Sequence, residues 1–580
     1  MASRRRYLAA VGALCGLAGC TDLFGSSDST EPPPRTGPPT ETQSPAGTGT
    51  PGAPTSTDPG DGVNETPAST TTERETATPD PLGDRFETIL DVTEHGVDPS
   101  GSRPVGDRLA SLVDDDTLLR FPSGTYPLHD LEVSGVSNFG MVGDGATLKP
   151  LTLGRAIFLA FRRSSDILLE GFRVDNSETN VAAWCDLKVT GGTNVVRDYV
   201  VEDFVDVNER TNGFTIMVEG GDTSLALEDV DISKGAVNGA AVFVFPRREF
   251  YDPERAAGSL AFRDCVMKGW GKEGLYASPH EGPLEVVGGE YANNAIVQVR
   301  IGGGGPENRA VVRDVTVTVD RVPDYMPEYN QLLRGIWLKE GDRALVEDCD
   351  VTLRDVGVGQ TPGAIYVNDQ FGRATIRDCT VTTENVSQPA FLIQEPVEEF
   401  DPGRMPSLDE LPPAWDVTVE NVTIDGESPN TETIHVQGRD GVTLRDLTVE
   451  KRGQANDGIL LEDARDCRLE GGSLTTERFP VVIDFDGEDV DCALSVSETA
   501  IEGTDLYHDG EQLSGDGEYC VGSRSLADSR RDEHERLSLT RSDDGGDGTA
   551  TPTPGEGGEA AASKVQSDDE YRLYGRWLGP

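Results

Sequence analysis

The chain has 580 residues, and 103 Asp and Glu against 50 Lys and Arg give it a formal net charge of −53 at pH 7. So acidic a surface disfavours nucleic acid as a partner. Only eight of the cations are Lys, and the acids are spread along the whole chain, which is typical of proteins adapted to molar salt. At that ionic strength the Debye length is about 3 Å or less, so self-repulsion is screened, and we expect the fold to loosen in low salt.

The first twenty residues predict an exported lipoprotein. Three arginines at 4–6 precede an apolar stretch from Leu8 to Ala18, and Leu-Ala-Gly leads into Cys20. The pattern resembles a twin-arginine export signal that ends in a lipobox, with Cys20 as the lipidated first residue. The apolar run is too short to span a bilayer. We therefore expect a mature protein on the extracellular face of the cell membrane, anchored by its lipid.

Composition then divides the remaining chain into three parts. Residues 21–84 are Ser, Thr, Pro and Gly with hardly a large apolar side chain, so they cannot bury a core and are predicted to be a disordered tether. Residues 85–523 are predicted to be one folded domain. Residues 524–580 are predicted to be an acidic disordered tail.

Near the start of the folded domain a short helix is expected. Val105, Leu109, Leu112 and Val113 are spaced for one helix face. Such a helix suits the open end of a hydrophobic column as its cap.

Between residues 167 and 501 one pattern recurs twelve times: alternating apolar positions, a turn residue, and alternating apolar positions again. The turn residues are Gly171, Asp198, Asp229, Asp264, Gly289, Asp314, Asp348, Asp378, Asn421, Asp446, Gly471 and Glu498. All except Glu498 are of the types that tolerate a left-handed backbone. A large apolar residue stands two before each turn and, except at Ala292, another stands three after it. The pattern predicts two half-buried strands that meet at a corner, repeated as a solenoid.

A third strand precedes each of these pairs. It is clearest at 295–300, 335–339, 364–368, 433–437 and 458–462. Turn residues are at least 25 positions apart, which accommodates three short strands and three turns. Stacked repeats therefore predict three parallel sheets.

These repeats, with segments 89–92, 121–126 and 143–148, resemble the right-handed parallel β-helix of the pectin-lyase-like superfamily over roughly residues 85 to 505. With its signal and acidity, the chain also resembles haloarchaeal twin-arginine-exported lipoproteins. The resemblance implies an all-β solenoid of about twelve coils. In enzymes of this fold the substrate is an extended polysaccharide that lies along one sheet.

The outward positions of the third strand are the candidates for substrate binding. They are Tyr276, Gln298, Trp337, Tyr366, Asn368, Gln394, His435, Gln437 and Glu462. Aromatic faces and polar groups together suit sugars, although an ordinary solvated strand face shows similar residues. Insertions at 246–258, 320–333 and 396–415 flank this strand and favour a groove.

Two chemistries are open for catalysis. For a uronate lyase, Lys339 or Arg300 supplies the base or holds the sugar carboxylate, provided that a lowered pKa makes Lys339 basic at neutral pH. For a glycoside hydrolase, Asp369 and Asp484 are among the carboxylate candidates. The family's Gly-His-Gly and Arg-x-Pro-x-x-Arg elements are missing, so no catalytic residue is carried over from it.

No cofactor or metal is expected, although Ca²⁺ remains an alternative for a lyase. The recurring turn Asp follows from backbone geometry rather than from calcium binding. Cys265, Cys349 and Cys379 fall in one column as small core residues, and no Cys and His spacing suggests zinc. Whether Cys492 and Cys520 pair is left open.

The sequence thus favours a monomeric, lipid-anchored surface protein that binds polysaccharide and, as a lyase or hydrolase, cleaves it. A non-catalytic, adhesin-like protein that uses the rod as a contact surface is the competing class. A sugar isomerase or epimerase on the same fold is a third hypothesis.

Overall fold

The computed structural model describes residues 82–520 except for 152–155, 178–182, 206–210, 246–256, 304–307, 323–331, 357–362, 429–430, 454–455, 485–491, 503–506, 509–510 and 513–516. The signal with Cys20, nearly all of the predicted tether, and the C-terminal tail therefore lie outside the described residues, as do most of the first two insertions. Within the part of the chain that is described, no helix is long and apolar enough to cross a membrane.

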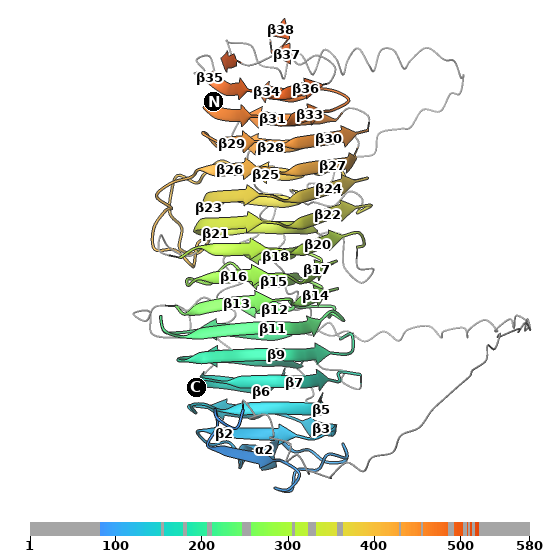
Figure 1. Ribbon diagram of the computed structural model, residues 1–580, viewed down its shortest axis with the longest axis vertical. Coiled ribbons are helices and arrows are strands. Elements are labelled where there is room, and N and C mark those ends of the chain that lie inside the picture. The colour runs from blue at the N-terminus through green and yellow to red at the C-terminus, as the bar shows by residue number, and fades with distance from the viewer. Residues whose placement is uncertain are drawn as a thin grey trace, which may run out of the picture. The chain divides into compact units, whose positions relative to one another are not determined.

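The strands stack in chain order into three parallel sheets (Figure 1). Sheet A, the predicted third-strand sheet, contains β4 (Leu131–Ser134), β6 (Ala156–Ser164), β8 (Ala183–Val189), β10 (Phe214–Val218), β12 (Val242–Val244), β15 (Glu273–Ala277), β18 (Val297–Ile301), β21 (Arg334–Glu347), β23 (Ile365–Arg377), β25 (Phe391–Ile393), β28 (Glu432–Gln437), β31 (Asp457–Glu462) and β34 (Val481–Asp484).

Sheet B is made by the strands before the turn residue. Its members are β1 (Thr88–Asp91), β2 (Thr117–Phe121), β5 (Gly140–Pro150), β7 (Leu168–Val174), β9 (Thr193–Val201), β11 (Ser224–Ile232), β13 (Ser259–Arg263), β16 (Leu284–Val287), β19 (Ala310–Arg313), the second halves of β21 and β23, β26 (Val417–Glu420), β29 (Thr443–Arg445), β32 (Cys467–Glu470) and β35 (Cys492–Ser497).

Sheet C is made by the strands after the turn residue. It contains β3 (Gly124–Leu128), the second halves of β5, β7, β9 and β11, then β14 (Val266–Lys268), β17 (Glu290–Ala292), β20 (Thr316–Val319), β22 (Asp350–Arg354), β24 (Thr380–Glu384), β27 (Thr423–Glu427), β30 (Thr448–Arg452), β33 (Ser473–Thr475) and β36 (Ala500–Glu502). The two short strands β37 (Tyr507–His508) and β38 (Glu511–Gln512) pair with each other, and β39 (Gly517–Cys520) pairs with β35; both pairs are antiparallel.

This all-β architecture of long parallel sheets is consistent with a right-handed parallel β-helix. The number of coils stays a prediction. A five-residue helix, α2 (Gly106–Ala110), lies where one was expected, and Val105 and Leu109 are buried in the main core. Leu112 and Val113 pack against that core while partly exposed, and the role of the helix as a cap stays a prediction.

The predicted left-handed turns are confirmed. All twelve residues have a φ between 49° and 84°, including Glu498, whose φ is 54°. Eleven of them align from one coil to the next. In the remaining coil the alignment was wrong by one residue, because Val287 pairs with Arg313 and so places Gly288, rather than Gly289, at the turn position.

The slip at Gly288 also moves two predicted core positions. Val286 and Tyr291 face inward and are fully buried, in place of Val287 and Ala292. Two glycines in a row and two valines in a row gave both alignments the same pattern, and only strand pairing separates them. The other inward columns form one continuous core, and Cys265, Cys349 and Cys379 are buried in it as predicted.

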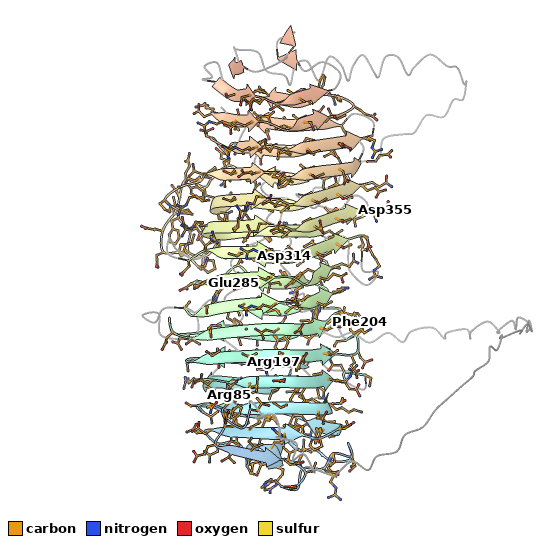
Figure 2. The ribbon with its side chains drawn as sticks, viewed as in Figure 1. Arg85, Arg197, Phe204, Glu285, Asp314 and Asp355 are labelled. Atoms are coloured by element: carbon orange, nitrogen blue, oxygen red, sulfur yellow. The ribbon has the colours of Figure 1, made fainter. Side chains whose placement is uncertain are left out.

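An unpredicted feature runs along the outer side of sheet B, one residue before each turn from Gly171 to Gly471. Opposite charges alternate there between neighbouring strands, through Glu170, Arg197, Glu228, Arg263, then Arg313, Glu347, Arg377, Glu420, Arg445 and Glu470, with Val287 as the one interruption. Arg197, labelled in Figure 2, lies 2.8 Å from Glu170, and Arg445 lies 2.8 Å from Glu470. We call this row the charge ladder.

Candidate functional site

The outward residues of sheet A meet in register. Tyr276 on β15 pairs with Arg300 on β18, which pairs with Trp337 on β21, which pairs with Tyr366 on β23. His435 follows two strands later, opposite Leu392. Strand pairing therefore brings the residues chosen by alternation onto one face, from segments up to 159 positions apart.

The aromatic members of this face are buried, so the expectation that they offer open platforms to solvent is wrong. Tyr366 is 1% exposed, and Tyr276 and Trp337 are also buried. Trp337 stacks on Tyr366 with ring centroids 5.7 Å apart, and both belong to an apolar cluster with Leu332 and Leu392. These rings act as an apolar wall beside the polar groups rather than as exposed stacking surfaces.

Gln298 is also wrong as a groove residue. Its side chain is fully buried; its oxygen accepts from the Asn294 amide at 2.7 Å, and its nitrogen donates to the carbonyls of Asn294 and Arg334. The side-chain amide closes a turn from Asn294 to Gln298, and alternation along a strand does not predict such a turn.

Arg300 is held rigidly on this face. Its guanidinium lies over the ring of Tyr276, 3.9 Å from the centroid, and 4.8 Å from that of Trp337. It donates to the Ser278 hydroxyl at 3.0 Å and to the Tyr276 hydroxyl at 3.1 Å. Stacking and two hydrogen bonds fix a cation whose planar donors suit a carboxylate.

Lys339 lies on the next strand, at a point where the pairing of β21 with β23 is irregular. The register shifts between Leu338 and Glu340, and such bulges re-aim side chains. The Lys339 side chain is 15% exposed, and its ammonium donates to the Gln370 side-chain oxygen. Burial lowers the pKa of Lys339 to about 8; Glu340 opposes this shift and Arg300 reinforces it.

Glu340 is buried beneath this lysine. Its carboxylate is 4.0 Å from the Lys339 ammonium, and burial raises its pKa, against the effect of Lys339 and Arg300. Two ionisable groups thus sit together in a region of low dielectric, each destabilised in its charged form. With a pKa of about 8, a fraction of the Lys339 amine is neutral at neutral pH, and most of it is neutral above pH 8.

Buried polar atoms without a hydrogen-bond partner gather around this pair. Within the described residues they include both Glu340 oxygens, Trp337 Nε1, Asn368 Oδ1, Asp369 Oδ1 and Gln370 Nε2, all on β21 and β23. Native proteins satisfy nearly all such atoms, and clusters of exceptions mark functional sites. A polar ligand is the natural complement to them.

Asp369 joins the site with a cation that sequence reasoning missed. Asp369 Oδ2 accepts from Arg404 Nη2 at 2.9 Å, and the Asp369 carbonyl accepts from the Val397 amide. Arg404 belongs to the insertion at 396–415 and also contributes to the lowered pKa of Lys339. Its only sequence signal is its place in an insertion beside the candidate strand.

Toward the C-terminal end of sheet A, the outer face carries amide, imidazole and carboxylate side chains. Asn368 donates to the Tyr366 hydroxyl at 2.9 Å and to the Gln394 oxygen at 3.1 Å. His435 lies between Glu432 and Glu462, 3.3 and 2.9 Å away. Gln437 also donates to Glu462, at 3.2 Å.

The charge of the imidazole follows from these contacts. Burial disfavours the imidazolium of His435, but hydrogen bonds and charges from Glu432 and Glu462 outweigh burial and raise its pKa to about 9. The hydrogen bond from His435 in turn lowers the pKa of Glu462. This segment therefore carries two carboxylates around one bound cation at neutral pH.

Asp484 lies apart from the other predicted catalytic residues. Five strand-to-strand steps lead from Leu338 through Val367, Ile393, Val436 and Leu461 to Ile483. At about 4.8 Å per step, Asp484 is roughly 24 Å from Lys339. It cannot act at the same bond as Lys339, Arg300 and Asp369.

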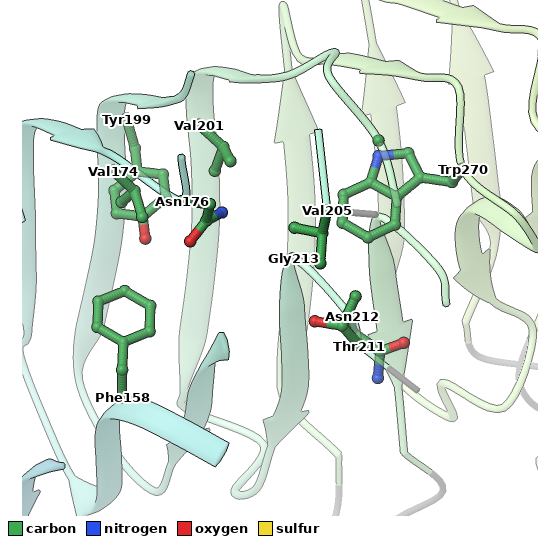
Figure 3. Close-up of a pocket in the computed structure, with 11 residues that line it drawn as sticks. Phe158, Val174, Asn176, Tyr199, Val201, Val205, Thr211, Asn212, Gly213 and Trp270 are labelled. Carbon is green, nitrogen blue, oxygen red and sulfur yellow. The ribbon is translucent and has the colours of Figure 1, made fainter. Parts of the chain in front are cut away.

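A small cavity lies elsewhere, inside the solenoid (Figure 3). It is lined by residues such as Phe158, Asn176, Tyr199 and Trp270, and its volume is about 10 Å³. That volume holds one water molecule, not a sugar.

Among the described residues, no group of three His, Cys, Asp or Glu side chains is gathered to hold a metal ion. Near Lys339 the accessible carboxylate, Asp369, is already paired with Arg404. The residues present do not fit a Ca²⁺ site there.

No family model matches the sequence, and no curated protein matches it. Solved structures with a similar fold include the PfbA surface adhesin of Streptococcus pneumoniae, at 11% identity over 75% of this chain and 100% of that one, with a TM-score of 0.40. The A-module of the Azotobacter vinelandii mannuronan C-5 epimerase AlgE4 is 12% identical over 64% of this chain and 97% of that one, with a TM-score of 0.37. An exopolygalacturonase from Thermotoga maritima is 9% identical over 74% and 95%, with a TM-score of 0.34.

These neighbours include carbohydrate-active enzymes and a surface adhesin, and such distant likenesses do not choose among them. Fold and site together define a parallel β-helix protein with a cationic, partly buried polar site on the outer face of sheet A.

Proposed function

We propose that the protein is a polysaccharide lyase that acts on uronate-containing chains. The observation that carries the proposal is Lys339, an amine of lowered pKa that lies between Arg300 and Asp369 amid buried polar atoms without partners. A lyase needs a base near neutral pH and a cation that stabilises charge on the sugar carboxylate.

The proposed reaction is a β-elimination. Arg300 holds the uronate carboxylate, and the neutral amine of Lys339 takes the proton from C5, next to that carboxylate. The C5–H electron pair forms the C4–C5 double bond as the C4–O bond breaks. The proton on Lys339 is then available to the departing oxygen, so the chain is cleaved without water.

The arrangement of carboxylates disfavours hydrolysis. A glycoside hydrolase needs two of them across the bond, about 5 to 9.5 Å apart. Glu340 is fully buried, Asp369 is paired with Arg404, and Asp484 is roughly 24 Å from Lys339.

The test is to incubate residues 85–523 in molar KCl with polymers of uronates and of neutral sugars, and to follow both ultraviolet absorbance and new reducing ends. We expect unsaturated product from uronate polymers only. Lys339→Met should abolish it, whereas Lys268→Met, which removes a partly exposed lysine of sheet C paired with Glu290, should not.

Other outcomes identify the competing functions. Exchange of the C5 proton with deuterium without cleavage would indicate an epimerase. Reducing ends without absorbance would indicate a hydrolase. Binding without any change in the sugar would leave the adhesin-like class.

We also propose that the protein is held by lipid at Cys20 on the outer face of the membrane, through the tether at 21–84. The order of arginines, apolar stretch and cysteine supports this. Cys20→Ser in the full chain should move the protein from the membrane fraction to the medium. Retention of that variant in the membrane would contradict the anchor.

A further inference from the structure

Resting on the proposed lyase function, we infer that Glu340 is a positioning residue that acts through Lys339. Its buried carboxylate holds the ammonium that forms on Lys339 when the amine takes the C5 proton.

The first argument is the placement of the Glu340 carboxylate. It is fully buried and lies 4.0 Å from the Lys339 ammonium, and neither oxygen has a hydrogen-bond partner. Arg300 and the Ser278 hydroxyl also face it, but Arg300 donates to that hydroxyl. A buried carboxylate held in this way is costly, and an apolar side chain of similar volume is often no less stabilising. The chemistry of its neighbour therefore explains Glu340 better than fold stability does.

The second argument is the exclusion of water. Two glycines of one coil, Gly302 and Gly303, lie against Glu340 and Gly341 of the next coil. A Cβ atom on Gly302 would lie 2.7 Å from the Glu340 carbonyl oxygen. One on Gly341 would lie 2.1 Å from the Gly303 nitrogen. The backbones of the two coils are thus packed without room for a side chain, so the carboxylate depends on protein cations rather than on water.

The third argument is the set of charges around Lys339. Burial lowers the pKa of Lys339, and among the neighbouring charges Glu340 opposes this shift most strongly. Arg300 and Arg404 add to the shift, and Asp369 opposes it. Asp369 is already paired with Arg404, whereas the ion pair of Glu340 among the described residues is with Lys339. Glu340 is therefore the carboxylate committed to this amine.

The fourth argument is orientation. Glu340 pairs with Gln370 across β21 and β23, and the Gln370 side-chain oxygen accepts from the Lys339 ammonium. The amine is thus held between a carboxylate of its own strand and an amide of the next. A charge fixed beside the amine stabilises the ammonium during proton transfer without reorganisation.

The first test measures the charge of Lys339 without any sugar. Acetic anhydride acylates the neutral amine but not the ammonium, and the Lys339 side chain is 15% exposed. Trace labelling of the full-length protein from about pH 5 to about pH 11 in ~1 M KCl, followed by peptide mass, should give a midpoint near pH 8. Glu340→Gln should move that midpoint down by about one unit or more, because the amine loses the nearby negative charge.

The second test measures catalysis on a uronate polymer. In Glu340→Gln the rise of kcat/KM with pH should move down by the same interval, and its plateau should fall about three- to tenfold because the amine is a weaker base. Glu340→Asp keeps the charge on a shorter side chain and should give a midpoint between the two. A residue that only supports the fold would change the plateau and leave the midpoint in place.

The matched control is Asp342→Asn. Asp342 is also a buried carboxylate of β21, but it is paired with Arg373 at 2.5 Å. Its removal should leave the labelling midpoint of Lys339 unchanged. The melting temperature of each variant shows whether it is folded.

An unchanged labelling midpoint in folded Glu340→Gln would overturn the inference and leave the proposed lyase function intact. If Glu340→Gln does not fold, Glu340→Asp decides in its place, and a midpoint equal to that of the parent protein overturns the inference. A parent protein whose labelling shifts as expected, but which makes no unsaturated product, would instead count against the proposed function.

Discussion

At the scale of residues, Lys339 shows how a position seen in sequence acquires chemistry from its surroundings. Alternation placed it on the outer face, where a solvated lysine has no special basicity. In the folded protein, Lys339 is surrounded by Trp337, Glu340 and the insertion that bears Arg404. Loss of water lowers the pKa of the amine, which is the property that a base near neutral pH requires.

A pH profile tests this basicity. Because the proposed mechanism uses the neutral amine of Lys339, kcat/KM on a uronate polymer should rise as pH rises through about 8 and level off above it. Lys339→Arg, which stays protonated, should lower kcat/KM at least ~100-fold at every pH. The values pH 6 and pH 9 lie about one unit or more from the pKa of Lys339. If the active protein has a flat profile between them, Lys339 is refuted as the base.

Glu498 is the exception among the turn residues, and the structure gives it the same left-handed backbone, with a φ of 54°. A left-handed conformation costs a non-glycine residue about 1 kcal/mol. Glu498→Gly should therefore raise the free energy of unfolding by up to about 1 kcal/mol, measured in denaturant. Glu470→Gly, within strand β32, should lower it instead.

At the scale of elements, the charge ladder gives the strands of sheet B from β7 to β32, except β16, an electrostatic preference for their neighbours. Glu347 is its best-buried member and accepts from both Arg313 and Arg377. Those two hydrogen-bonded cations, Arg377 most strongly, hold the pKa of Glu347 below its usual range. Glu420 is more exposed, and its distance to Arg445 is 3.8 Å.

We therefore expect Glu347→Gln to lower the free energy of unfolding by about 1–2 kcal/mol, and Glu420→Gln by less than about 0.5 kcal/mol. Because the folded-state pKa of Glu347 is depressed, its contribution is present above the ordinary glutamate pKa and is lost as pH falls through the folded value. Denaturant unfolding of both variants at neutral and acidic pH measures this. Equal losses for the two variants would contradict it.

The two cysteines whose pairing the sequence left open lie at the C-terminal end of sheet B. Cys492 on β35 lies opposite Cys520 on the antiparallel strand β39. Opposed residues have Cα atoms about 4.5–5.5 Å apart, a separation that a disulfide bridges. The five other described cysteines are free and buried.

Exported proteins meet oxidising conditions, so we expect Cys492 and Cys520 to form a disulfide. The two thiols pass two electrons and two protons to an external disulfide, which is reduced to two thiols. Alkylation in denaturant, read by intact mass, should then label five of the seven cysteines of residues 85–523, and all seven after reduction. Labelling of all seven without reduction would contradict the pairing.

At the scale of the whole molecule, we expect the net charge of −53 to make stability depend on salt. The charge ladder has five Glu and five Arg and is formally neutral, so the excess of acids lies elsewhere in the chain, where we expect it to repel itself in dilute buffer. The melting temperature of residues 85–523 should fall by at least about 10 °C from molar to ~0.1 M KCl. Sucrose of equal osmolality should not restore it, and a melting temperature independent of salt would argue against adaptation to molar salt.

The sequence by itself determined the solenoid, its turns and nearly all of its inward columns, because these depend on local rules. Each repeat contains period-two alternation and a residue that accepts a left-handed φ. Because the pattern recurs twelve times in the sequence, an irregular residue in one repeat does not hide it. The slip at Gly288 occurred where both alignments obeyed those rules equally. Only pairing with Arg313 on the next coil resolves it.

The tertiary structure alone decided what the outer face of sheet A became. The burial of Tyr366 and Gln298, the basicity of Lys339, the bond between Asp369 and Arg404, and the separation of Asp484 all depend on neighbouring coils and on an insertion that folds back. Desolvation and ion pairing act through space between residues far apart in the chain. A pattern within one coil carries no information about either.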